Sequence, residues 1–129
     1  MNAPRLIVVD DSALIRQAID SILNSRYEVV ASVPDGKTAI TAVAGFAPEL
    51  VLLDISMPGI NGFEAARQIK RASPLTLIIF VSEHKETSYI EAGFSAGASG
   101  YVVKSKMMSE LLPAIQSVLS GQEYGRLTA

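Results

Sequence analysis

The sequence predicts one α/β domain in which helices cover both faces of a parallel sheet, a doubly wound arrangement. Five short apolar runs alternate along the chain with five segments whose apolar residues recur at intervals of three and four, and this alternation is typical of strand-helix-strand units. One run, residues 50–53, is apolar throughout, which indicates a strand buried on both faces. The chain of 129 residues is long enough to form one domain with its own core.

Two strand and helix pairs are expected in the first third of the chain. Residues 6–9 form a β-rich run, and residues 13–23 follow with the periodicity of an amphipathic helix. Residues 27–33 are predicted to form the second strand. Pro34, Asp35 and Gly36 then interrupt the chain before a helix that includes residues 39–46.

The buried third strand is followed by three further predicted helices and two strands. The loop from Pro58 to Gly62 precedes a helix over residues 63–70, because proline and glycine favour a turn there. Residues 75–81 contain the most strand-like run of the chain. A weaker helical pattern over residues 86–95 leads to a brief strand at residues 101–103.

A last helix is expected from about Met107 to Leu119, ending at Gly121. Pro113 lies inside this stretch, so we expect it either to kink the helix or to mark the start of its regular part. The domain is predicted to span residues 1–121, and residues 122–129 are predicted to form a tail or the start of a linker.

Composition excludes several classes of protein. The absence of cysteine rules out disulfides and thiolate metal sites, and it fits a reducing compartment. A net charge of -2 argues against a surface that binds the phosphate backbone of nucleic acids. The apolar run near the N-terminus is too short for a secretory signal or a membrane span. We therefore expect a soluble, cytoplasmic protein with no membrane contact.

Polar side chains follow four of the five predicted strands. Asp10 and Asp11 follow the first strand, Asp54 the third, Ser82 the fourth and Lys104 the fifth. Because the carboxyl ends of parallel strands meet at one edge of a sheet, these side chains are expected to converge there. Each also has an ordinary explanation: the aspartates as helix caps or turn residues, Ser82 as a turn hydroxyl, and Lys104 as solvated surface. Their joint placement favours a functional site.

Three clustered carboxylates repel one another and raise each other's pKa values unless a cation lies between them. Hard oxygen ligands with room for water suit Mg²⁺. Together with the Lys104 amine, such an ion would neutralise the cluster, so an incoming phosphoryl group would meet a nearly neutral site. The pattern therefore predicts a magnesium-dependent phosphoryl acceptor.

Across nearly its whole length the chain resembles the receiver domain of two-component response regulators. The matching pieces are Asp10-Asp11, the segment Asp54-Ile55-Ser56-Met57-Pro58-Gly59 with Gly62, Ser82, and Gly100-Tyr101-Val102-Val103-Lys104. The resemblance implies a flavodoxin-like (βα)5 fold with strand order 2-1-3-4-5. It also implies a signalling switch that is not an enzyme acting on a separate substrate.

The resemblance assigns a role to each site residue. Asp54 would accept a phosphoryl group from a phosphohistidine on a sensor histidine kinase or phosphotransfer protein. Asp11, Asp54 and the backbone carbonyl of Ser56 would bind Mg²⁺, with Asp10 assisting through water. Lys104 would pair with the phosphoryl oxygens.

Ser82 and Tyr101 match the hydroxyl and the aromatic ring that switch together in this family. The new phosphoryl charge would draw the Ser82 hydroxyl toward it, and the Tyr101 ring would move inward behind it. The surface formed by the fourth helix, fifth strand and fifth helix would then change and control an output such as transcription. A homodimer through that surface, or through the fifth helix, is also expected. DNA would be reached only through an output domain, which is absent from this sequence.

Three residues depart from the common family pattern. Glu83 stands where a small residue is typical, and His84 occupies a position that tunes dephosphorylation; an exposed loop histidine is the plainer interpretation. Ser105 replaces the proline that usually follows the lysine, a form similar to NarL/FixJ-like receivers.

Two other functions stay open from the sequence alone. The chain could be a receiver-fold binding module that works without phosphorylation because Glu83 impairs the chemistry. A metal-dependent phosphatase of the haloacid dehalogenase type fits less well, because its nucleophile and acid stand two residues apart whereas Asp10 and Asp11 are adjacent. Flavin or nucleotide binding is disfavoured because no glycine-rich phosphate loop follows any strand.

Overall fold

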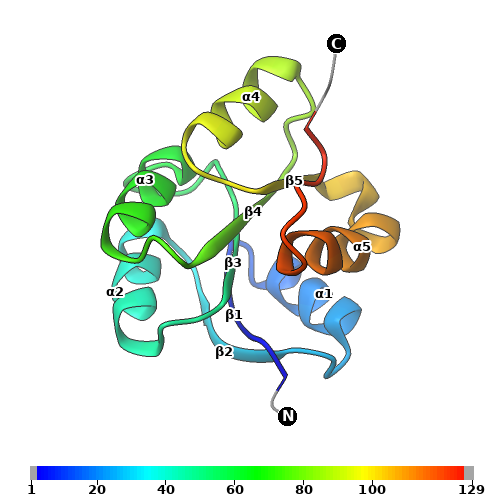
Figure 1. The fold of residues 1–129 in the computed structure, drawn as a ribbon, viewed down its shortest axis with the longest axis horizontal. Helices are drawn as coiled ribbons and strands as arrows, with labels where there is room; N and C mark the ends of the chain where they lie inside the picture. Colours follow the sequence, from blue (N-terminus) through cyan, green and yellow to red (C-terminus); the bar gives the residue numbers. More distant parts are fainter. Residues whose placement is uncertain (1–2, 127–129) are drawn as a thin grey trace.

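The computed structural model describes residues 3–126, and Figure 1 shows strands and helices alternating along that part of the chain. The elements are β1 (Arg5–Val9), α1 (Ala13–Leu23), β2 (Glu28–Val33), α2 (Gly36–Phe46), β3 (Leu50–Leu53), α3 (Gly62–Ala72), β4 (Leu77–Ser82), α4 (Thr87–Ser95), β5 (Gly100–Val103), the 3₁₀ turn η1 (Lys104–Lys106) and α5 (Met107–Leu119).

The five strands form one parallel sheet in the order β2-β1-β3-β4-β5, which confirms the predicted fold class. Register places Leu53 of β3 between Val9 of β1 and Phe80 of β4. The next residue of β1 and of β3 is an aspartate, so Asp10 and Asp54 leave the sheet side by side. This pairing sets the position of the functional edge.

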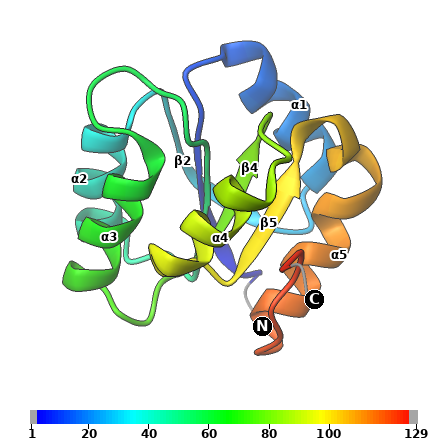
Figure 2. The ribbon, with the colours of Figure 1, turned by 90° about the horizontal axis from the view of Figure 1, so that it is seen from above.

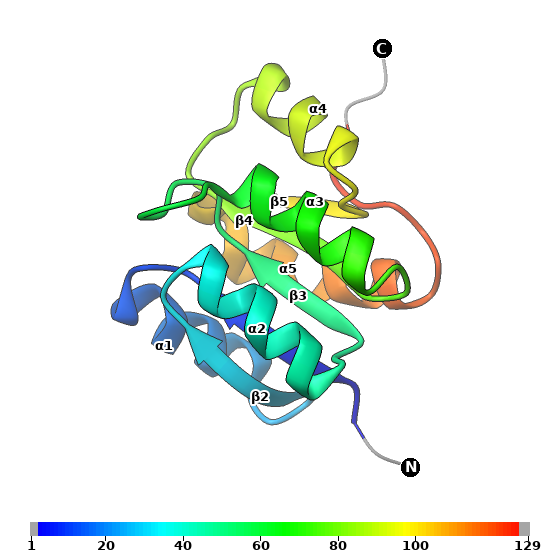
Figure 3. The same cartoon turned by 90° about the vertical axis from the view of Figure 1, so that its left-hand side faces the viewer.

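Helices cover the sheet on both faces, as the doubly wound arrangement requires. Figures 2 and 3 show α2 and α3 together on one face, with α1 and α5 on the opposite face. Two buried clusters fill the space between the layers, one beneath α2, α3 and α4 and one beneath α1 and α5. Every residue of β3 is buried, as its continuous apolar run predicts.

Side chains cap the first three helices. The Ser12 hydroxyl accepts the Ile15 N–H at 3.2 Å and so caps α1. Asp35 caps α2 and Asn61 caps α3 in the same way. The cap positions of α4 and α5 make no such side-chain hydrogen bond.

Most differences from the predicted bounds are one or two residues at the ends of elements. The fourth strand begins at Leu77, because the side chain of Leu75 is 92% exposed in the turn before it. The helix containing Pro113 runs without interruption from Met107 to Leu119, so its regular part does not begin at the proline. Pro113 is exposed to solvent on this helix.

The chain after α5 returns to the sheet. The Tyr124 N–H donates to the Ser99 carbonyl at 3.0 Å, and the Tyr124 carbonyl accepts the Tyr101 N–H at 2.9 Å. Tyr124 thereby forms a single parallel bridge beside Gly100 on the outer edge of β5. Of the helices between residues 3 and 126, none has the length and apolar character to cross a membrane.

Candidate functional site

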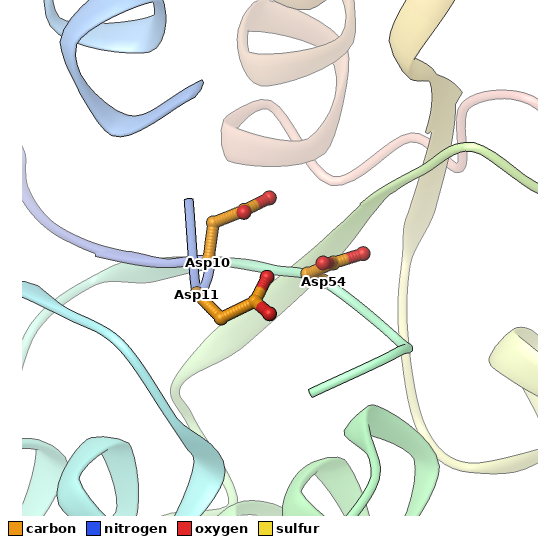
Figure 4. Close-up of side chains that lie close together, drawn as sticks. All are labelled: Asp10, Asp11 and Asp54. Atoms are coloured by element: carbon orange, nitrogen blue, oxygen red, sulfur yellow. The ribbon is translucent and has the colours of Figure 1, made fainter. Parts of the chain in front are cut away.

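The carboxyl ends of β1, β3 and β5 bring Asp10, Asp11, Asp54 and Lys104 to one edge of the sheet. The Asp54 N–H donates to the carbonyl of Val9 at 3.0 Å, which places the two strand ends in contact. Figure 4 shows the side chains of the three aspartates gathered at this edge. The predicted convergence of these acidic residues and the lysine is therefore present in the structure.

The three aspartates form a compact acidic group. One carboxylate oxygen from each of Asp10, Asp11 and Asp54 lies within 4.8 Å of the others. Asp10 and Asp54 are buried and Asp11 is exposed. All three line a cavity of about 390 Å³ together with Lys104. A buried carboxylate pair with an open third member makes a site that a small charged group can enter.

Lys104 is the counter-charge of the two buried carboxylates. Its Nζ lies 2.8 Å from Asp10 Oδ2 and 3.3 Å from Asp54 Oδ2. Burial would lower the pKa of Lys104, but its hydrogen bond and ion pairs with Asp10 and Asp54 outweigh burial and raise that pKa. The amine therefore remains charged.

The surroundings of Asp54 disfavour its charged form. Burial raises the pKa of Asp54, and the nearby charge of Asp10 raises it further, against the opposing effect of Lys104. The Asp54 Oδ1 accepts the Ile55 N–H at 2.8 Å, which fixes the orientation of the carboxylate. The charged form of the Asp54 carboxylate would therefore be stabilised by a bound cation.

Backbone contacts lock the loop after β3. The Gly62 N–H donates to the Ile55 carbonyl at 2.8 Å. A Cβ at Gly62 would lie 2.1 Å from the Asp54 carbonyl oxygen, so only glycine allows this close approach.

Two hydrogen bonds hold Asp10 at the end of β1. Asp10 Oδ1 accepts the Ser12 N–H at 2.9 Å, and the Arg16 guanidinium donates to the Asp10 carbonyl at 2.6 Å. No sequence pattern indicated Arg16, because its guanidinium contacts a backbone carbonyl.

The acidic group fits a hard divalent cation. Carboxylate oxygens are the ligands that Mg²⁺ prefers, and the open cavity leaves space for the water that this ion retains. Asp10, Asp11 and Asp54 would hold it. Ser56 lines the same cavity, and the use of its backbone carbonyl as a ligand stays a prediction.

Ser82 and Tyr101 lie behind the acidic group. Ser82 is the last residue of β4, is fully buried, and accepts the His84 N–H on its Oγ at 3.0 Å. The Tyr101 ring is only 3% exposed, and its hydroxyl donates to the His84 carbonyl at 2.6 Å. Burial raises the pKa of the Tyr101 phenol. The Tyr101 side chain is therefore buried in this structure.

Glu83 and His84 lie at the rim of the cavity. Both line it, and Glu83 is exposed. The His84 imidazole stacks on Tyr89 with ring centroids 3.9 Å apart, and its Nε2 lies 3.2 Å from Ser56 Oγ. His84 is thus held between the loop after β3 and helix α4, and is not a free loop side chain. Its contact with Ser56, which is 28 residues away, could not be predicted from the sequence.

A row of aromatic rings connects the rim of the cavity to Tyr101. From Tyr89 the contacts pass to Phe63 at 6.2 Å, to Phe80 at 5.6 Å, and to Tyr101 at 6.3 Å between centroids. These distances are within the range of favourable aromatic pairs. The rings therefore form a continuous series of contacts from Tyr89 to Tyr101.

Comparison with known proteins now identifies the family. The sequence profile of the response regulator receiver domain matches residues 6–116. The chain belongs to this family. Receiver domains are signalling modules of two-component systems and not enzymes, which confirms that part of the prediction.

Relatives of this receiver domain include longer regulators. Transcriptional regulatory protein DegU of Brevibacillus brevis is 34% identical over 125 residues, which cover 95% of this chain and 53% of DegU. Response regulator UvrY of Escherichia coli (strain K12) is 38% identical over 121 residues, which cover 92% of this chain and 56% of UvrY. The chain thus spans about half the length of these curated relatives.

Solved structures give the same family. The two-component response regulator of the LuxR family from Aurantimonas sp. SI85-9A1 matches with a TM-score of 0.91 at 31% identity, covering 97% of this chain and 91% of that one. The signal receiver domain of the putative response regulator NarL from Mycobacterium tuberculosis matches with a TM-score of 0.86 at 26% identity, covering 95% and 100%. The predicted likeness to NarL/FixJ-like receivers is confirmed.

Proposed function

We propose that this receiver domain accepts a phosphoryl group on Asp54 from a phosphohistidine of a partner histidine kinase or phosphotransfer protein. The observation that carries the proposal is the contact of Lys104 Nζ with both Asp10 and Asp54, with Asp11 beside them at the mouth of one cavity. An anion entering this cavity meets a fixed amine and a carboxylate whose negative charge is disfavoured.

The proposed step is a simple displacement at phosphorus. An Asp54 carboxylate oxygen forms a bond to phosphorus while the bond from phosphorus to the histidine nitrogen breaks, and the imidazole leaves and takes up a proton. Lys104 stabilises the phosphoryl oxygens through charge-assisted hydrogen bonds. Bound Mg²⁺ would neutralise negative charge on the carboxylates and on the transferring group.

The response would begin at Ser82 and Tyr101. A phosphoryl group on Asp54 offers strong acceptor oxygens to which the Ser82 hydroxyl can donate, and turning toward them would displace the Ser82 Oγ that now accepts the His84 N–H. That displacement would shift the loop whose His84 carbonyl also accepts the Tyr101 hydroxyl. The faces of α4, β5 and α5 would change as a consequence, which is sufficient for a two-state switch.

The output is proposed to be transcription. It is supported by the longer relative DegU, a transcriptional regulatory protein. Met108 is 78% exposed at the start of α5, where it could contribute to a homodimer contact. We place the exchange in the cytoplasm, where a histidine kinase has access to ATP.

Glu83 and His84 are proposed to tune the chemistry. Glu83 adds a negative charge at the cavity mouth, which should repel anionic phosphoryl donors. His84 is held against Ser56 and Tyr89, so it restricts how water approaches Asp54. Both positions therefore affect how fast the phosphoryl group arrives or leaves.

Incubation with acetyl phosphate and Mg²⁺ tests the proposal. Intact-mass spectrometry should show the gain of one phosphoryl group, and peptide mapping should place it on Asp54. Asp54→Asn should show no gain, whereas the exposed Asp20→Asn should behave like the wild type. Glu83→Ala should accelerate the gain.

A binding module that needs no phosphorylation is the second candidate. It is favoured by Glu83 at the cavity mouth and by Tyr101, which is already buried with its hydroxyl on the His84 carbonyl. A protein that binds Mg²⁺ but takes up no phosphoryl group, in the wild type and in Glu83→Ala, would favour this function over the first.

A further inference from the structure

The segment after α5, residues 122–126, forms a strap along the edge of the sheet. Figure 1 shows the chain leaving α5 and passing beside β5 toward α4. Tyr124 exchanges two backbone hydrogen bonds with β5 and the residue before it, at 2.9 Å to Tyr101 and 3.0 Å to Ser99. Its half-buried side chain packs against the cluster beneath α5. The strap therefore covers the edge strand that contains the switch tyrosine.

A second anchor joins the strap to α4. The Arg126 guanidinium lies 4.9 Å from the centre of the Phe94 ring and 3.8 Å from the Glu91 carboxylate. Both residues belong to α4. The ion pair is largely exposed and contributes little alone, but the stacked arginine adds packing and a cation-π contact. The strap thus bridges β5 and α4.

The fit of the strap on Tyr101 depends on a glycine. Gly125 has φ of +86°, and a Cβ placed on it would lie 2.2 Å from the Tyr101 carbonyl oxygen. A side chain there would both strain the backbone and push the strap away from β5. The Tyr101 backbone is consequently held by the strap on its N–H side and in close contact on its carbonyl side.

Helix α4 packs directly on the Tyr101 ring. Its cap residue, Glu86, makes no side-chain hydrogen bond to the first turn. Gly93 of α4 lies so close to the sheet that a Cβ there would be 3.0 Å from the Phe80 ring and 3.3 Å from the Tyr101 ring. The position of α4 and the position of the ring are therefore linked through this contact.

We propose that the strap is a component of the switch: by holding α4 against β5, it favours the inward position of Tyr101. Docking of the strap and burial of the ring stabilise each other, and such coupling between two sites is reciprocal. A phosphoryl group on Asp54 that favours the inward ring would accordingly tighten the strap. This last step rests on the proposed function, whereas the coupling between strap, α4 and ring does not.

Hydrogen exchange measured by NMR on the whole chain tests the coupling. Gly125→Ala should release the strap, so the Tyr101 and Tyr124 amides should exchange about tenfold faster. The amides of α4 should also exchange faster, and the Tyr101 ring signals should shift. Gly121→Ala is the matched control, since Gly121 has φ of +94° but open space around its Cα.

Arg126→Gln provides a milder variant that keeps the fold. It should accelerate exchange in α4 by about two- to threefold without changing the remaining helices. Arg67→Gln is its control, because Arg67 also pairs with a glutamate three residues before it at similar exposure. The proposal is overturned if the strap amides accelerate while α4 and the Tyr101 ring do not respond. It is equally overturned if neither variant loosens the strap.

Adding beryllofluoride, a phosphoryl mimic, with Mg²⁺ separates this inference from the proposed function. Signals near Asp54 and Lys104 report whether the site is occupied. Occupation should slow exchange of the Tyr101 and Tyr124 amides in the wild type and less so in Gly125→Ala. Occupation without any change in the strap would overturn the inference alone. Failure to occupy the site would count against the proposed function, and the two strap variants would still decide the coupling.

Discussion

Replacing Asp54 by asparagine should stabilise the metal-free protein, although it removes an ion pair. The Asp54–Lys104 contact of 3.3 Å corresponds to an attraction of about 5 kcal/mol at an effective dielectric constant of roughly 20. Repulsion from Asp10 and from Asp11, at 4.8 Å or less, amounts to about 3.5 kcal/mol each or more on the same scale. Burial further disfavours the charged Asp54 carboxylate, whereas the solvent around the exposed Asp11 weakens the repulsion between Asp11 and Asp54.

The balance favours the neutral side chain by about 1–2 kcal/mol. For a domain of this size that difference should raise the melting temperature by about 5 °C. The assay is thermal unfolding followed by circular dichroism at neutral pH, with a chelator and physiological salt. Asp20→Asn, an exposed change on α1, should stay within about 0.5 kcal/mol of the wild type.

The pH dependence has a definite sign. The folded-state pKa of Asp54 is raised above its usual value. Its contribution to the free energy of unfolding is therefore most favourable at low pH and is lost as pH rises through that folded-state pKa. The advantage of Asp54→Asn should therefore shrink as pH falls below the folded-state pKa. Mg²⁺ at about 100 times its dissociation constant should stabilise the wild type by about 2.7 kcal/mol and the variant by less. If Asp54→Asn melts at or below the wild-type temperature without metal, the charge balance derived from these distances is wrong.

Two further variants test the same edge of the sheet. Lys104→Met leaves Asp10 and Asp54 buried without their counter-charge and should lower the free energy of unfolding by about 3–5 kcal/mol, measured with denaturant and without metal. Lys106→Met, which is exposed in the same turn, is the control. A loss below about 1 kcal/mol for Lys104→Met would show that water already solvates the two carboxylates well. Gly62→Ala should destabilise by at least about 2 kcal/mol, because its Cβ meets a carbonyl oxygen at 2.1 Å. Gly45→Ala, with open space around it in α2, should instead stabilise by about 0.5–1 kcal/mol. Similar results for the two glycines would contradict the packing argument.

The position of the acidic site could be predicted because it depends on one general property of parallel sheets. Asp54 follows a run that is apolar throughout, so both the strand and its end are visible in the sequence. Once the other strands are recognised, their carboxyl ends are expected to share one edge of the sheet. The location of Asp10 and Lys104 at the site can then be predicted without any knowledge of side-chain contacts.

Features that depend on close packing could not be predicted in this way. Ile90 of α4 and Met107 of α5 belong to helices of the predicted signalling surface, but they are only 5% and 8% exposed because both pack into the core clusters. The Ser56 hydroxyl that contacts His84 lies 28 residues away in the sequence. The strap, residues 122–126, has neither apolar periodicity nor a run of β-branched residues, so its pairing with β5 leaves no pattern to recognise.

Lys104 also determines when the domain needs its ion. Since one amine already bridges two of the acidic groups, we expect the polypeptide to fold in ion-free solution and to bind Mg²⁺ afterwards in a separate, reversible equilibrium. On the proposed function, removing the metal would then stop phosphorylation without unfolding the domain, and adding it back would restore phosphorylation without a refolding step.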